Sequence, residues 1–73
     1  MNYEPFYFWK VEVVDEGEHT TLQCMVEAHD DDTYSWRILN MTTGEIMTHD
    51  GYDGGSHAKG ACTKFIRNNF GRI

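Results

Sequence analysis

Two neighbouring segments, residues 6–14 and 19–28, alternate between apolar and polar residues, and this limits the fold more than any other feature. A period of two is typical of a strand with one buried face. The polar segment 15–18 between them contains a Gly and suits a tight turn. The sequence therefore predicts an antiparallel hairpin. The side chains expected inward are Tyr7, Trp9, Val11, Val13, Thr20, Leu22, Cys24, Val26 and Ala28.

Two more strands are expected downstream of this hairpin. Residues 33–40 alternate again, with Tyr34, Trp36 and Ile38 expected inward. Residues 41–44 then predict a second tight turn, and residues 45–49 a short fourth strand in which Ile46 is the expected inward anchor. Residues 50–55 (DGYDGG) are rich in Gly and predict a loop.

The last segment, residues 56–70, has helical spacing. Ser56 is expected to cap the helix, because its hydroxyl can accept from a free backbone N–H, and Gly71 is a natural stop. Lys59, Lys64 and Arg67 fall on the open face. The buried stripe follows i, i+3, i+4, i+7 spacing and comprises Ala58, Ala61, Cys62, Phe65, Ile66 and Asn69.

These elements predict a single α+β domain over residues 1–73. It has a three- to four-stranded antiparallel meander sheet with one C-terminal helix packed on one face. A chain of 73 residues forms a thin core, to which four Phe, four Tyr and two Trp contribute much of the buried area.

The second half of the chain resembles a known family. The segments Tyr34-Ser35-Trp36-Arg37-Ile38, Gly44-Glu45-Ile46 and Gly51-Tyr52, followed by a helix with Ala58, Ala61 and Ile66, are similar to the YegP-like domain of small bacterial proteins. The resemblance covers residues 33–70. It implies a sheet-plus-helix unit that pairs with another such unit, and it implies no catalysis. Thr43 in place of the usual Asn, and the missing basic residues after Gly-Tyr, depart from the pattern.

Charge is distributed unevenly along the chain. The net charge is −6, and all twelve acidic residues lie between Glu4 and Asp53. The last twenty residues carry only bases: Lys59, Lys64, Arg67 and Arg72. The N-terminus has no secretory signal pattern, no apolar run has the length of a membrane span, and two cysteines do not make a disulfide framework. We therefore expect a cytoplasmic protein that does not enter the membrane.

One face of the predicted sheet lacks a cover. It would show Phe6, Phe8, Met25, Leu39 and Met47, and a monomer rarely exposes so large an apolar patch. We therefore expect a protein partner or a second copy, which would make a homodimer. Acidic residues beside the patch would steer a basic partner, and small phage-encoded inhibitors have similar size and charge. The candidate partner-binding residues are Phe6, Phe8, Asp15, Glu16, Glu18, Met25, Asp30, Asp31 and Asp32.

Nucleic-acid binding is the alternative function. Lys59, Lys64, Arg67 and Arg72 offer phosphate contacts, and exposed aromatic rings offer stacking. The acidic remainder of the chain opposes it, because affinity for phosphate depends on neutralising negative charge.

The spacing and placement of the remaining candidate residues argue against metal binding, phosphate binding and nucleophilic catalysis. The possible metal ligands His29, His49, Asp50, Asp53 and His57 match no zinc or calcium signature. Residues 55–60 have the two Gly of a phosphate loop, but Ala61 stands where its Lys is needed. Cys24 and Cys62 fall at core positions on separate elements, where thiols are inert. The sequence indicates no enzyme, no metal and no cofactor.

Overall fold

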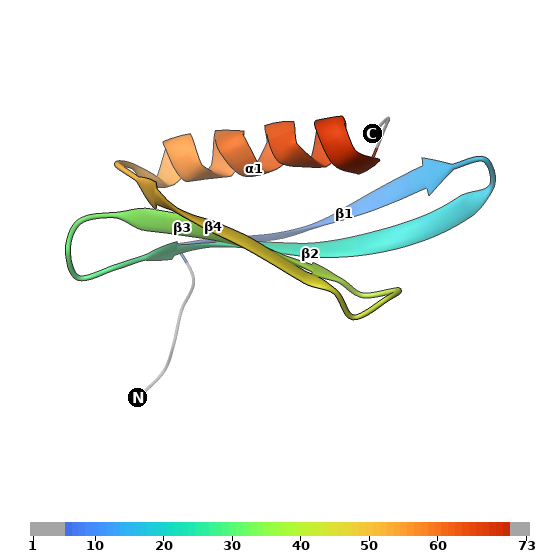
Figure 1. Ribbon diagram of the computed structural model, residues 1–73, viewed down its shortest axis with the longest axis horizontal. Coiled ribbons are helices and arrows are strands. Elements are labelled where there is room, and N and C mark those ends of the chain that lie inside the picture. Colours follow the sequence, from blue (N-terminus) through green and yellow to red (C-terminus); the bar gives the residue numbers. More distant parts are fainter. Residues whose placement is uncertain (1–5, 71–73) are drawn as a thin grey trace.

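The computed structural model describes residues 6–70 as a four-stranded antiparallel sheet with one helix packed on it (Figure 1). Strands β1 (Tyr7–Asp15), β2 (Glu18–Ala28), β3 (Tyr34–Asn40) and β4 (Ile46–Tyr52) lie side by side in chain order, and helix α1 (Gly55–Phe70) follows. The predicted α+β meander with a helix on one face is confirmed. The predicted stop at Gly71 lies outside the described residues.

The hairpin of β1 and β2 forms where the alternation predicts it. Asp15 pairs with Glu18, and the two residues between them, Glu16 and Gly17, both have positive φ. Two such residues make the tight turn whose twist matches that of the flanking strands. Because β3 begins to pair with β2 only at Leu22, the end of the hairpin projects beyond the rest of the sheet (Figure 1).

The core lies between the sheet and α1, which packs chiefly against β2 and β3. The inward side chains of the strands pack against Ala58, Cys62 and Ile66 of the helix, and those at the centre of the sheet are fully shielded from solvent, namely Leu22, Cys24, Val26 and Ile38. Small residues at 58 and 62 let the helix approach the sheet closely. Asn69, which we expected in the buried stripe, is exposed, and its amide donates to the carbonyl of Phe65.

The expected orientation of β4 is wrong. Ile46 is 61% exposed, whereas Met47 pairs with Ile38 and packs against the core. The turn explains this, since Asn40 and Glu45 close it with a 2.8 Å hydrogen bond and thereby place Ile46 opposite Leu39. A shift of one residue moves every side chain to the other face.

The boundaries of β4 and α1 also differ from expectation. The segment 50–52, predicted as loop, continues β4 through an irregularity opposite the stretch from Tyr34 to Trp36, where Gly51 adopts φ +91°. The helix starts at Gly55, and its first turn closes from the N–H of Ala58 to the carbonyl of Gly54. Ser56 therefore lies inside the first turn and is not the cap.

Candidate interaction surfaces

The sheet face opposite the helix carries two apolar cross-strand pairs. Phe8 pairs with Met25, and Leu39 pairs with Ile46. Phe8 is 49% exposed, and Met25 and Leu39 are half-buried. Met25 lies opposite Arg37, which makes it a diagonal neighbour of Leu39, and diagonal neighbours in a sheet lie within reach of long side chains. We call these four residues the open-face patch.

Phe6 does not belong to this patch, although we expected it there. Its ring packs against the rings of Tyr7 and Tyr34, with centroid distances of 4.8 and 5.3 Å, and lies over Gly55 at the start of the helix. A ring that contacts α1 is on the helix side of the sheet. The absence of a side chain at Gly55 makes room for it, and this long-range contact left no signal in the local pattern.

Charges around the open-face patch are mixed. The guanidinium of Arg37 lies 3.6 Å from the carboxylate of Glu27, and a ring nitrogen of His19 lies 2.8 Å from Glu12 across the hairpin. Lys10 pairs with Gln23 on the same face. The centre of this face is therefore close to neutral.

The acidic candidates occupy two turns instead. Asp15, Glu16 and Glu18 lie at the projecting end of the hairpin, and Asp30, Asp31 and Asp32 lie in the turn after the other end of β2. The eleven residues of β2 separate these turns by about 33 Å. They are two acidic surfaces and not one.

Asp31 has a local structural role. Its carboxylate accepts hydrogen bonds from the hydroxyl and the backbone N–H of Thr33, at 2.6 and 3.2 Å. These bonds hold the pKa of Asp31 below its usual range, because they favour the charged form. The carboxylate thus orders the turn between β2 and β3.

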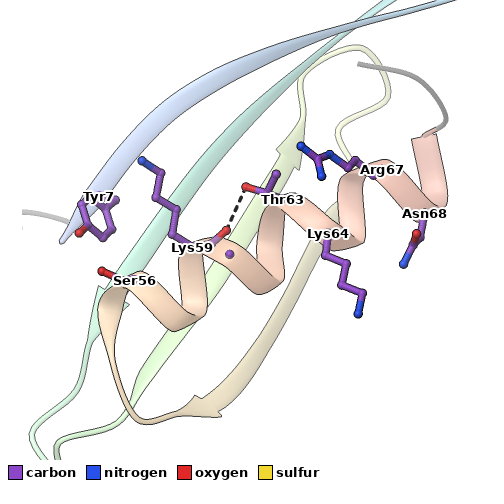
Figure 2. Close-up of a pocket in the computed structure, with 8 residues that line it drawn as sticks. Tyr7, Ser56, Lys59, Thr63, Lys64, Arg67 and Asn68 are labelled. Carbon is purple, nitrogen blue, oxygen red and sulfur yellow. Dashed lines mark hydrogen bonds between the residues drawn. The ribbon is translucent and has the colours of Figure 1, made fainter.

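A basic groove of about 760 Å³ runs between β1 and α1 (Figure 2). Lys59 and Arg67 extend from the helix toward β1, and Tyr7 stands at one end of the groove. The ammonium of Lys59 lies 4.9 Å from the ring centroid of Tyr7 and 5.4 Å from that of Trp9, which is cation–π geometry. Within residues 6–70, neither Lys59, Lys64 nor Arg67 forms an ion pair. Arg72 lies outside the described residues.

A second groove, of about 670 Å³, lies between β4 and α1. Its floor is aromatic: the rings of Trp36 and Phe65 are 4.9 Å apart, and the indole N–H of Trp36 donates a 3.0 Å hydrogen bond to the hydroxyl of Tyr52. The sequence pattern did not predict this groove, because the expected register of β4 placed Met47 on the opposite face of the sheet. The groove is lined by Trp36, Ile46, Met47, Thr48, His49, Tyr52, Ala61, Lys64, Phe65 and Asn68.

The possible metal ligands are dispersed over the described residues. His57 bonds to the carboxylate of Asp53 at 2.9 Å, His29 bonds to the hydroxyl of Ser35 at 2.8 Å, and His49 stacks on Trp36. Within residues 6–70, no three His, Cys, Asp or Glu side chains gather where a metal ion would fit.

The two cysteines lie closer together than their separate elements suggested. Cys24 on β2 and Cys62 on α1 are both fully buried, and their thiols lie close enough to interact. Interaction with the Cys24 thiol, followed by burial, raises the pKa of Cys62 far above its usual range. A buried, protonated thiol is a poor nucleophile.

The one helix that the structure describes does not combine the length and apolar character needed to span a membrane. Comparisons with protein-family models, with curated proteins and with solved structures find no match to this chain. The resemblance to the YegP-like domain stays a prediction.

Proposed function

We propose that this protein is a small, non-enzymatic interaction module that binds a protein partner through the open face of its sheet, as a regulator or inhibitor would. The observation that carries the proposal is the open-face patch. It places Phe8 and Ile46, about half exposed or more, on a rigid sheet whose other face is filled by the helix. Exposed aromatic and Met side chains on a rigid surface are typical anchors of protein interfaces.

The acidic end of the hairpin supports the same proposal. Asp15, Glu16 and Glu18 are exposed and project beyond the sheet, at the end of the hairpin opposite to the Phe8–Met25 pair. Charges at the rim of an interface accelerate association more than they tighten it. We therefore assign affinity to the patch and steering toward a basic partner to the hairpin.

Site-specific photo-crosslinking tests the proposal in cells that make the protein naturally. A photoreactive phenylalanine at position 8 should give a discrete adduct, either with one partner protein or with a second copy. The same probe at exposed Gly60 on the helix serves as the control. Phe8→Ser with Ile46→Ser should then weaken binding of the identified partner about tenfold or more. Equal adducts at positions 8 and 60, or a strict monomer with no adduct, would contradict the proposal.

Nucleic-acid binding is the second candidate, and the basic groove favours it. Three bases without ion pairs in residues 6–70 lie along the helix, and Tyr7 offers a ring beside them. Titration with single-stranded and duplex DNA at low salt tests it. Binding that weakens with salt and with Lys59→Ala and Arg67→Ala, but not with Phe8→Ser, would favour this function over the first.

A further inference from the structure

Strand β4 forms one edge of the sheet, so one side of its backbone has no partner strand within the described residues. The hydrogen bond from the Asn40 N–H to the Glu45 carbonyl determines which residues of β4 direct their backbone groups toward β3. In an antiparallel pair, residues facing the neighbouring strand alternate with residues facing away. The backbone N–H and C=O groups of Met47 and His49 therefore face β3, and those of Ile46 and Thr48 face outward.

The aromatic groove lies directly beside this free edge. Met47 and His49 contribute to it from β4, and Ala61, Lys64 and Phe65 contribute from α1. A free edge alone attracts any extended chain, and an apolar groove alone accepts many ligands. Side by side, they match one ligand class best: an extended peptide, whose backbone pairs with the edge while alternate side chains enter the groove.

We propose that β4 and α1 bind an extended segment of the protein partner as a fifth strand. This rests on the proposed function and specifies how the partner is held. One set of the segment's side chains enters the groove and includes an aromatic or large aliphatic residue over Trp36 and Phe65. The other set lies beside Ile46 and continues the open-face patch.

The positive charge of Lys64 further restricts the composition of the segment that the groove binds. Lys64 stands at the groove wall and forms no ion pair within residues 6–70. Figure 2 shows its side chain directed away from the basic groove at β1. An acidic residue on the groove side of the segment is its natural partner. The recognised sequence therefore alternates and combines a large apolar residue with an acidic one.

Selection from a displayed library of random peptides tests this inference. Peptides enriched on the wild-type protein should share the alternating apolar and acidic pattern and should slow amide exchange at Ile46 and Thr48. Thr48→Pro removes one outward N–H, a change that edge strands tolerate, and should weaken the enriched peptides about tenfold. Thr48→Val is the matched control, because it loses the same hydroxyl bond to the Trp36 carbonyl but keeps the N–H, and it should bind normally.

Two further variants test the inference without changing position 48, because a Pro in β4 also affects folding. Lys64→Glu should weaken peptides that carry the acid and spare those that lack it, and Phe8→Ser should leave every enriched peptide unaffected. No enrichment, or enriched peptides that bind Thr48→Pro and Lys64→Glu as well as they bind wild type, would overturn the inference. If Phe8→Ser still abolishes binding of the whole partner in that case, the proposed function stands while the peptide site does not.

Discussion

The thiol of Cys24 on β2 and the thiol of Cys62 on α1 meet in the centre of the core, and neither residue is exposed to solvent. Their contact joins the sheet to the helix within a cluster of fully buried side chains that includes Leu22 and Ile38. The reactivity of the two thiols therefore shows whether the helix is packed on the sheet.

The first prediction concerns thiol reactivity. Because both thiols are buried and the pKa of Cys62 is raised, a maleimide should modify the native protein about a hundredfold to several thousandfold more slowly than the denatured one. This factor follows from about 3–5 kcal/mol of stability for a domain of this size. Mass spectrometry of protein quenched at intervals measures it. Fast labelling of the native protein at one cysteine would show that the helix is not docked as described.

The second prediction tests the register of β4 with two residues of the same type. Ile38 is fully buried and Ile46 is 61% exposed. Ile38→Ala should cost about 2–5 kcal/mol, a large part of the stability of a domain of this size, whereas Ile46→Ala should change stability by about 0.5 kcal/mol or less. Urea denaturation followed by Trp fluorescence compares them. If Ile46→Ala destabilised the protein more than Ile38→Ala, Ile46 would be the residue of β4 that points inward.

The third prediction concerns the contact of Phe6 with the helix. A side chain at Gly55 would overlap the Phe6 ring, so Gly55→Ala should destabilise the protein by about 1–3 kcal/mol. The cost should shrink when Phe6→Ala is combined with it, and thermal unfolding of the four proteins in this cycle measures the coupling.

Gly60 provides the matched control for that cycle. A Cβ there meets nothing within 4 Å, and Ala is the better helix former, so Gly60→Ala should stabilise by about 0.5–1 kcal/mol. An equal gain from Gly55→Ala would mean that Phe6 does not pack against the helix.

The fourth prediction concerns pH and the first turn of α1. The hydrogen bond from His57 lowers the pKa of Asp53. A carboxyl group whose pKa is lowered by folding stabilises the fold above its ordinary pKa of about 3.9, and this contribution is lost as pH falls through the lowered value. Asp53→Asn should therefore lower the melting temperature at pH 7, and the difference from wild type should vanish in acid.

His57→Gln separates the effect of this hydrogen bond from other effects of the Asp53 substitution. In that background Asp53→Asn should change the melting temperature less at pH 7. A difference between wild type and Asp53→Asn that is constant from pH 7 to pH 3 would contradict the role of the charge.

Local patterns in the sequence were sufficient to predict most of the architecture. The period of two in residues 6–14 and 19–28 specified the hairpin and its inward face, because alternation along a strand is a local property. Helical spacing located α1 to within one residue of its start. The orientation of β4 was also accessible from the sequence, since a four-residue turn after Asn40 places Met47 opposite Ile38, whereas the prediction placed Ile46 inward.

By itself, then, the sequence determined which segments are extended, which is helical, and that one face of the sheet lacks a helix. Only the tertiary structure decided that Phe6 turns to the helix, that the two thiols meet, and that a groove opens beside β4. The physical reason is that these features depend on strand register and on packing between distant segments. Neither is encoded in the periodicity of any one segment.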